Sequence, residues 1–426
     1  MPKIIVVGGG WSGCGAALAA AKAGAEGVLI ERTDMLLGTG LVGGIFRNNG
    51  RFTAAEEAIA MGGGELFNLM DSMARHKHVD FPGHKHASLY DVFNIEPEVE
   101  KLLADLGVKV MLRARVVNVK MKDKRIESII LENKTAVEGD YFVDCTGTAA
   151  VPANCIKYGN GCAMCILRCH TFKPRVSITE KAGVKEWAGK KADGTLGAMS
   201  GSCKLMKESL SDKVRKELDE KGTSVVPLPQ KLVKQEKLKK KACVQYALHE
   251  FAENIVLLDT GPAKLMASFF PLEELRTVPG FEHTRYEDPI AGGIGNSIRF
   301  MAMAPKDNTL KVQGIENLFC GGEKAGPHVG HTEAIVTGLL AGHNAVRTAL
   351  GMKCIEISTQ TAIGDFISFV NRETQTEEGQ KNRYTFSGGL YFERMKKLGL
   401  YSTNIEEIKE RVKKAGLTDF FSKKLR

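Results

Sequence analysis

Residues 4–31 constrain the fold more than any other part of the chain. An apolar run ends there at three glycines in the order G-x-G-x-x-G, which are Gly8, Gly10 and Gly13. A segment of small residues and a second apolar run follow, and the second run ends at Glu31. This order is typical of a strand, a tight turn, a helix and a second strand. It predicts an α/β fold built on a parallel sheet.

Each glycine of this turn has its own physical role. Gly8 permits the sharp turn, Gly10 lets a pyrophosphate approach the backbone, and Gly13 lets the helix pack close to the strand. The free N–H groups at the start of the helix favour phosphate binding. The Glu31 carboxylate, at the tip of the second strand, can accept hydrogen bonds from the ribose hydroxyls of an adenosine. The stretch therefore predicts a dinucleotide site.

Composition limits the class of protein. The chain has 426 residues, which predicts roughly two to three domains. It contains no apolar run of the roughly 18 residues that a membrane span needs. The first strand begins almost at Met1, so we expect no signal peptide. Ten cysteines without a secretion signal favour a reducing, cytoplasmic location and thiol or metal chemistry.

The order of the patterns predicts the domain organisation. We expect a Rossmann-like, three-layer domain with a mostly parallel sheet, interrupted by an inserted α+β domain and followed by a helical C-terminal segment. The expected boundaries are 1–150 for the first part, 151–270 for the insertion, 271–352 for the second part and 353–426 for the helical segment.

Two further stretches allow alternatives. Residues 54–76 are expected to form one helix, and four histidines lie between His76 and His86. These histidines could bind a metal, but the lysines between them favour an exposed loop. The stretch Lys204–Lys241 has 12 Lys/Arg and 6 Asp/Glu, a net charge of +6. It could bind RNA or another anionic partner, or it could be a solvated helical face.

Three separated segments resemble a known flavoprotein superfamily. They are I-V-V-G-G-G-W-S-G-C-G-A-A with Glu31, Y-F-V-D-C-T-G-T-A-A, and N-L-F-C-G-G-E-K-A-G-P-H-V-G-H-T-E-A-I-V-T-G-L-L-A-G-H-N-A. The superfamily binds FAD on a glutathione-reductase-like fold. The third segment is similar to the glucose-inhibited division protein A group, which includes the folate- and FAD-dependent tRNA uridine methyltransferase.

This resemblance implies a set of FAD contacts. The backbone at Val116 would contact the adenine, and Glu323 would lie near the ribityl chain and pyrophosphate. His331 would begin the last helix, beneath the flavin, where the positive helix end favours the anionic reduced form; a structural cap is the alternative for this histidine. The implied cofactor-binding residues are Gly8, Gly9, Gly10, Trp11, Ser12, Gly13, Glu31, Arg32, Gly38, Val116, Thr146, Gly147, Gly322, Glu323, His331, Thr332 and Ala334.

The chain departs from the uridine-modifying enzymes at one loop. Those enzymes carry a cysteine after the second strand, whereas the corresponding loop here reads L-V-G-G-I-F-R-N-N-G-R-F, with Arg47, Asn48 and Asn49 but no cysteine. The departure is compatible with a relative that kept the flavin and changed the substrate.

A cysteine cluster lies just after the second matching segment. Cys155, Cys162, Cys165 and Cys169 could ligate an iron–sulfur cluster, with Cys203 as another possible ligand. The same cysteines could bind zinc, and Cys162 with Cys165 could form a redox dithiol. Buried unreactive thiols are the remaining interpretation. The candidate catalytic residues are Cys165, Cys162, His331 and Arg299, the last to hold a substrate carboxylate or phosphate.

Three functions follow. The first is a FAD-dependent oxidoreductase that transfers hydride at flavin N5, with NAD(P)H as a transient reductant and a small molecule or protein thiol as partner. The second is folate- and FAD-dependent RNA uridine modification, with the basic stretch binding RNA. The third is a protein in which FAD is purely structural. The missing loop cysteine counts against the second, and the intact flavin-side segment counts most strongly against the third.

Overall fold

The computed structural model describes most of the chain. Its described residues are 1–147, 176–190, 194, 198–199, 202–240, 244–267, 270–287, 298–299 and 301–425. None of the helices in these ranges combines the length and the apolar composition that crossing a bilayer requires.

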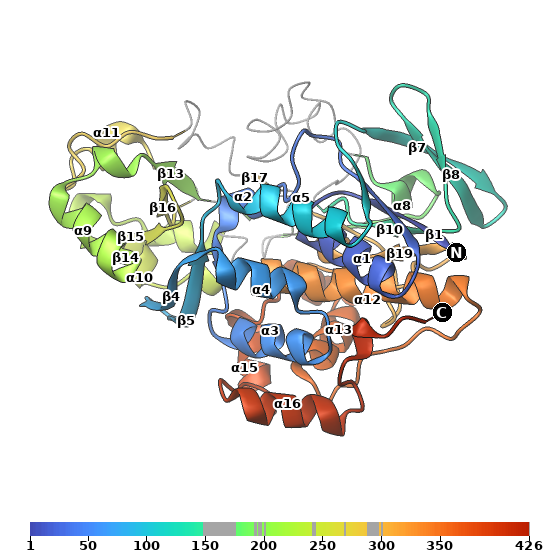
Figure 1. The fold of residues 1–426 in the computed structure, drawn as a ribbon. Helices are drawn as coiled ribbons and strands as arrows, with labels where there is room; N and C mark the ends of the chain where they lie inside the picture. Colours follow the sequence, from blue (N-terminus) through green and yellow to red (C-terminus); the bar gives the residue numbers. More distant parts are fainter. Residues whose placement is uncertain are drawn as a thin grey trace.

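A five-stranded sheet, parallel throughout, forms the central layer (Figure 1). From β1 the chain continues to β2 and β6 on one side of β1, and it then crosses to β10 and β19 on the other side. The strand order therefore reverses between β1 and β10. Ligands of open parallel sheets bind at the carboxyl edge beside such a reversal. The predicted Rossmann-like sheet is thereby confirmed. In spatial order its strands are β19 (Leu318–Cys320), β10 (Tyr141–Asp144), β1 (Lys3–Val7), β2 (Glu26–Ile30) and β6 (Lys109–Met111).

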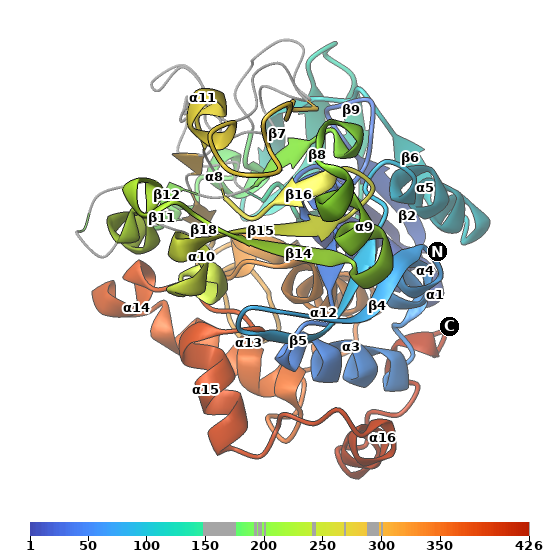
Figure 2. The same cartoon turned by 90° about the vertical axis from the view of Figure 1, so that its left-hand side faces the viewer.

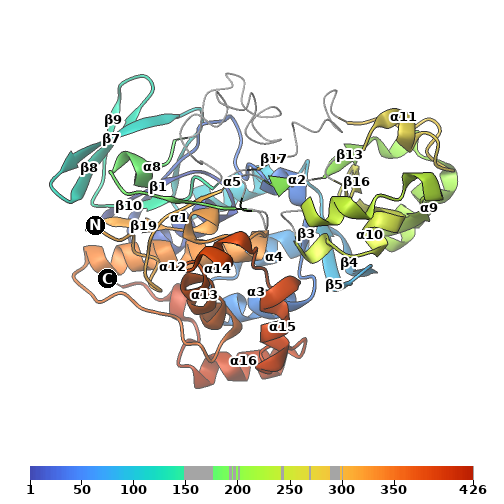
Figure 3. The same ribbon diagram turned by 180° about the vertical axis from the view of Figure 1, so that it is seen from behind.

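Two helices, α1 (Trp11–Lys22) and α12 (His331–Ala349), lie side by side on one face of the sheet (Figures 1 and 3). They meet through backbone, because a Cβ at Gly338 would overlap the carbonyl oxygen of Ser12 and one at Gly342 would overlap that of Ala16. The antiparallel meander lies on the opposite face of the sheet. Its strands are β7 (Val116–Lys122), β8 (Arg125–Leu131) and β9 (Ala136–Glu138).

The region after β2 differs from the single helix and loop expected for residues 54–86. Met61 and three glycines end the first helix, since Gly62 has a φ of +76°. The four histidines lie in a β-hairpin, not a loop, and His84 is buried within it. The elements are α2 (Gly40–Gly43), β3 (Ile45–Phe46), α3 (Gly50–Ala60), α4 (Glu65–Ser72), β4 (Ala74–Phe81), β5 (His84–Tyr90) and α5 (Ile95–Asp105).

A second, antiparallel sheet is formed mainly by residues from the middle of the chain (Figure 2). It has a hydrophobic cluster of its own, in which Leu218 and Val214 of α9 (Asp212–Lys221) pack against Leu257 and Leu265 of the sheet. Its strands in order are β13 (Cys203–Leu205), β16 (Ala263–Leu265), β15 (Asn254–Asp259) and β14 (Thr223–Pro227). α10 (Glu250–Glu253) lies beside this sheet, whereas α8 (Ile178–Lys181) lies against β7 of the meander. The remaining short elements are α11 (Leu272–Leu275) and the strand pairs β11 (Trp187–Ala188) with β18 (Ala302–Met303) and β12 (Ala198–Met199) with β17 (Ile298–Arg299).

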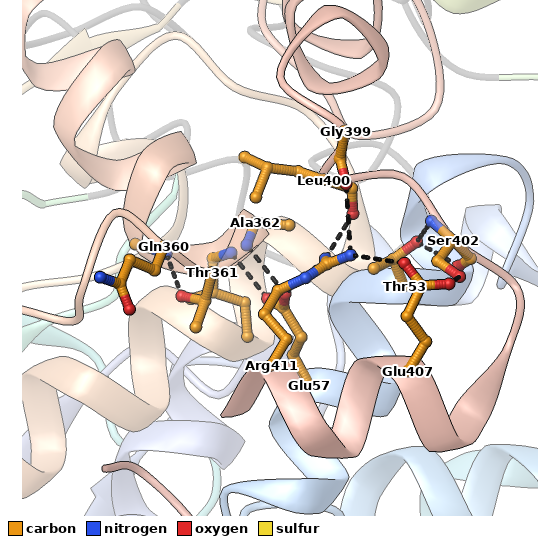
Figure 4. Close-up of polar contacts among 12 residues, drawn as sticks. Thr53, Glu57, Gln360, Thr361, Ala362, Gly399, Leu400, Ser402, Glu407 and Arg411 are labelled. Atoms are coloured by element: carbon orange, nitrogen blue, oxygen red, sulfur yellow. Dashed lines mark hydrogen bonds and ion pairs between the residues drawn. The ribbon is translucent and has the colours of Figure 1, made fainter. Parts of the chain in front are cut away.

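The C-terminal segment is helical, as predicted, and packs under α3 (Figure 3). A buried carboxylate joins the two parts: Glu57 of α3 accepts hydrogen bonds from the backbone N–H groups of Ala362 and Ile363, at 2.8 and 2.9 Å. Arg411 donates to the same carboxylate at 3.3 Å and to the Leu400 carbonyl (Figure 4). Glu57 thus supplies the negative charge that the start of α13 favours. The helices are α13 (Ala362–Glu373), α14 (Glu377–Lys381), α15 (Gly389–Lys397) and α16 (Ile405–Lys414).

We predict that Glu57→Gln lowers the free energy of unfolding by about 2 kcal/mol, since the amide offers one acceptor oxygen and leaves a buried N–H without a partner. Denaturant unfolding of the whole chain measures the effect. Glu410→Gln is the matched control, because Glu410 lies on α16 with its side chain 52% exposed. Equal stability of the two variants would contradict the structural role of Glu57.

Candidate flavin-dinucleotide site

The turn after β1 has the geometry that its glycines predict. Gly8 has a φ of +101°, and a Cβ there would overlap the carbonyl oxygen of Cys145. A Cβ at Gly13 would overlap the carbonyl oxygen of Gly8. By contrast, a Cβ at Gly10 would meet no atom within 4 Å. The first two glycines are therefore required by the fold, whereas Gly10 borders open space in which a phosphate can lie.

Glu31 lies beside this turn and is held by the chain itself. Its Oε2 accepts from the backbone N–H of Gly9 at 2.8 Å, and its Oε1 accepts from the backbone N–H of Thr33 at 2.9 Å. The backbone N–H of Ala114 donates to the Glu31 carbonyl, which brings the segment leading to Val116 next to the same edge. Glu31 and the segment leading to Val116 thus share one edge of the sheet, and their contact with an adenosine stays a prediction. Arg32 and Gly38 lie in the adjoining segment, and a Cβ at Gly38 would meet no atom within 4 Å.

Two more segments close this edge of the sheet. After β10, Thr146 donates to Asp144 from both its N–H and its hydroxyl, and Gly147 has a φ of +62°. After β19, the N–H of Gly322 donates to the Thr337 hydroxyl at 2.9 Å. Glu323 follows in the 3-10 helix η6 (Gly322–Ala325) and is partly exposed. All of these residues lie in the second and third segments that resemble the flavoproteins.

The first turn of α12 carries a polar atom without a partner. The Thr332 hydroxyl is buried, and no described group bonds to it. An unpartnered buried hydroxyl costs free energy, so its position indicates that another molecule bonds there. Ala334 lies in the same turn and is partly exposed. Other buried atoms among the described residues, such as both ring nitrogens of His343, also have no partner, so it is the place of Thr332 at a helix N-terminus that makes it a candidate ligand contact.

His331 lies between the two helix starts. Its Nδ1 is 3.1 Å from the Tyr90 hydroxyl, which itself donates to the Gly40 carbonyl at 3.0 Å. The Tyr90 proton is thereby donated to Gly40, so the His331 ring donates from Nδ1 to the Tyr90 oxygen. The Trp11 ring packs against the His331 ring at a centroid distance of 5.9 Å. Burial raises the pKa of Tyr90, which keeps the phenol protonated.

The neighbouring Glu333 has a structural role that the sequence did not reveal. Its buried carboxylate pairs with Arg51 of α3 at 3.1 Å and accepts from the Thr385 hydroxyl at 2.6 Å. Arg51 also donates to the Val329 carbonyl and to Asn48. The start of α12 is therefore fixed to α3 and to the C-terminal segment.

In the loop that lacks the cysteine, the polar side chains bond to other parts of the protein. Arg47 pairs with Asp71 and Glu56 at 2.6 and 2.5 Å, and its side chain is only 8% exposed. The Asn49 amide donates to the Ser387 carbonyl. Asn48 is fully buried and donates to His84. These side chains support the loop.

His84 is buried in a mostly aromatic environment. Its Nδ1 accepts from Asn48 at 2.9 Å, its Nε2 donates to the Gln245 carbonyl at 2.9 Å, and Phe81 stacks on it at 4.7 Å. Burial lowers the pKa of His84 to about 3. The ring is therefore neutral at ordinary pH and is unavailable as an acid. Among the described residues, no group of three or more histidine, cysteine or acidic side chains is arranged to hold a metal.

The predicted cysteine site lies outside the described residues. This holds for Cys155, Cys162, Cys165 and Cys169, and for the side chain of Arg299. Where cysteines are described, burial raises the pKa values of the Cys14, Cys145 and Cys320 thiols, which disfavours the reactive thiolate. Cys203 is also buried. An iron–sulfur cluster or dithiol therefore stays a prediction.

The basic stretch is partly neutralised. Lys207 pairs with Asp219 and Asp259, and Lys234 pairs with Glu274. The Lys207–Asp259 pair is mostly buried, with side chains 12% and 1% exposed, so Lys207 is engaged within the protein, and RNA binding by this stretch stays a prediction.

The sheet, the glycine turn and the glutamate at the tip of β2 are typical of dinucleotide-binding proteins of the FAD-dependent oxidoreductase type. Residues 3–155 match the family model described as FAD dependent oxidoreductase. Residues 263–353 match the model described as glucose inhibited division protein A, GidA. No curated protein matches the chain by sequence.

The whole chain has the fold of GidA. It matches one crystal form of Aquifex aeolicus GidA with a TM-score of 0.68 and 17% identity, over 98% of this chain and 74% of that chain. A second crystal form of the same protein gives a TM-score of 0.61 and 17% identity, over 97% and 78%. The predicted resemblance is thus confirmed, and the matches support FAD as cofactor and a FAD-dependent function. The residues present fit that cofactor at Gly10, Glu31 and Thr332.

We predict that Gly10→Val removes FAD binding without unfolding the protein. Gly10 has a φ of −70°, which valine tolerates, and its Cβ position is open, so the added methyl groups would occupy only the space of the phosphate. FAD retention and thermal unfolding of the apo-protein measure the two effects. Gly338→Val is the contrasting variant, because it would separate α1 from α12 and destabilise the fold. Normal FAD content in Gly10→Val would disprove the site.

We also predict that the free energy of unfolding falls as the pH is lowered below 6.5, because of His84. Its pKa in the unfolded chain is near 6.5, so the unfolded state binds a proton that the folded state rejects. Below pH 6.5 this costs up to about 1.4 kcal/mol per pH unit for the one group. The stability difference between wild type and His84→Gln should therefore shrink as the pH falls from 7 to 5. His249→Gln, at an exposed position, should track the wild type throughout.

Proposed function

We propose that this protein is a FAD-dependent oxidoreductase whose chemistry is hydride transfer at flavin N5. The single observation that carries the proposal is the orphaned Thr332 hydroxyl in the first turn of α12, at the same edge of the sheet as the Gly10 turn. Bound FAD supplies a two-electron acceptor for a hydride from reduced nicotinamide or from a substrate C–H bond. The natural substrate would be a small molecule or a protein thiol.

The protein's own groups would serve this chemistry in three ways. The N-terminus of α12, with its 19 residues, offers partial positive charge where negative charge develops. Thr332 donates a hydrogen bond at the same place. His331, oriented by Tyr90, would hold or move a proton beside the cofactor. The Trp11 ring packs against the His331 ring at a tilted angle.

Folate- and FAD-dependent RNA uridine modification is the second candidate, because residues 263–353 match the GidA model. The loop with Arg47, Asn48 and Asn49 weakens this candidate, since all three side chains are engaged within the protein. A nucleophile for uracil would have to come from the cysteines at 155–169, which lie outside the described residues.

An anaerobic absorption spectrum of the isolated protein, with iron quantified on the same sample, tests the proposal. Flavin bands that bleach with NADPH or NADH support the oxidoreductase. Flavin that bleaches only with methylenetetrahydrofolate, together with salt-sensitive RNA retention, supports the second candidate. A protein that stays colourless after incubation with FAD would overturn both.

We predict that Thr332→Val weakens FAD binding but does not lower the stability of the apo-protein. The variant should bind FAD about tenfold more weakly, because one hydrogen bond of roughly 1–1.5 kcal/mol is lost. The apo-protein should be at least as stable as the wild type, since an unpartnered buried hydroxyl is replaced by a methyl group. Thr337→Val is the contrast, because that hydroxyl bonds to Gly322 and to the Glu333 carbonyl and its loss should lower stability. Unchanged FAD affinity in Thr332→Val would contradict the placement.

A further inference from the structure

The four residues of α2 lie between the candidate site and the second sheet. A Cβ at Gly43 would overlap the His331 ring, and one at Gly40 would overlap the Trp11 Nε1 atom. The Gly40 carbonyl also accepts from the Tyr90 hydroxyl, which is itself bonded to His331. The position of α2 therefore limits the position of the His331 ring through two separate contacts.

This short helix has little to hold it in place by itself. It consists of one turn, no side chain caps its N-terminus, and Gly44 ends it with a φ of +79°. A single helical turn is not stable alone, and its last carbonyl groups have no N–H partner within the helix. The carbonyls of Val42 and Gly43 therefore need donors from another part of the chain.

Lys264 of β16 supplies these donors. Its Nζ donates to the Val42 carbonyl at 2.6 Å and to the Gly43 carbonyl. An ammonium group forms stronger hydrogen bonds than a neutral donor, and it suits the carbonyl end of a helix. The Ser202 hydroxyl adds a longer bond to the Val42 carbonyl, at 3.3 Å. Two residues from the middle of the chain thus hold the end of α2.

The second sheet fixes the place of this ammonium group. Lys264 is only 6% exposed, and its backbone pairs with Lys204 of β13 on one side and with Leu258 of β15 on the other. The turn after β15 touches the residue that ends α2, because a Cβ at Gly44 would overlap the Thr260 side chain. Direct contacts therefore connect the second sheet, α2 and the His331 ring.

We propose that Lys264 is a positioning residue for His331. By holding the end of α2, its ammonium group keeps Gly43 against the imidazole ring and so keeps the ring bonded to Tyr90. Without the two bonds of the ammonium group, α2 can shift and the ring is no longer confined to one position. The role in the reaction rests on the proposed function, in which His331 holds or moves a proton beside the cofactor.

The cofactor-free protein tests the link between Lys264 and His331. With isotope-labelled histidine, the ring nitrogen signals of His331 in a magnetic resonance spectrum are those that disappear in His331→Gln. Lys264→Met keeps a long side chain but removes its donors, so these signals should shift as Nδ1 loses its fixed bond to Tyr90. Gly43→Ala should shift the same signals by a separate route, since its Cβ would overlap the ring. Lys216→Met, at a lysine of α9 whose side chain is 74% exposed, should leave them unchanged.

A second measurement tests the role beside FAD. The midpoint potential of the bound cofactor should be more negative in Lys264→Met than in the wild type or in Lys216→Met. The reason is that the anionic reduced flavin would lose a group that holds a proton beside it.

The outcomes separate the parts of the proposal. If Lys264→Met fails to fold, as judged by thermal unfolding, or folds with unchanged His331 signals, the positioning role is overturned. Shifted signals together with an unchanged midpoint potential would overturn the role beside the cofactor. If no FAD binds, the proposed function fails, while the ring signals still decide whether Lys264 positions His331.

Discussion

The backbone contact between α1 and α12 is the constraint on which the rest of the structure depends. Because Gly338 and Gly342 have no side chains, α12 lies directly against the carbonyls of Ser12 and Ala16. Two helix N-termini are thereby fixed at one edge of the parallel sheet, although they lie far apart in the sequence. Their partial positive charges add at that edge, which suits a ligand with a pyrophosphate at one end and an electron-accepting ring at the other.

Buried polar pairs hold the loops around this edge. Arg51 and Glu333 fasten the start of α12 to α3, and Arg47 fastens the loop before α3 to α4. Burying charged groups is costly, and each pair is therefore bonded by further donors or acceptors, such as Thr385 at Glu333. Buried ion pairs thus fix the loops that surround the candidate site. The Thr332 hydroxyl, in the first turn of α12, has no described partner there.

The sequence predicted the parts of the site that depend on local patterns. The glycine spacing, the position of Glu31 and the start of α12 all follow from short-range geometry, and the structure brings Gly8, Thr146, Gly322 and His331 to one edge. The partners of Arg51 and Glu57 were missed, because pairs that are 282 and 305 residues apart leave no periodic signal. The His76–His86 hairpin was missed as well. Its strands contain bulges, with positive φ at His78 and His86, which break the alternation that identifies a strand.

The Glu57 contact with the start of α13 has a consequence for how the chain reaches its native state. It joins residues 306 positions apart, and the last strand of the central sheet is also supplied late in synthesis. Loop closure over such distances is slow, so β10 must remain without β19, and α1 without α12, until residues 318–349 have left the ribosome. During this interval the edge of β10 and the surface of α1 that α12 covers are exposed, and assembly with chaperones or rapid capture of the nucleotide would decide how much of the newly made protein escapes aggregation.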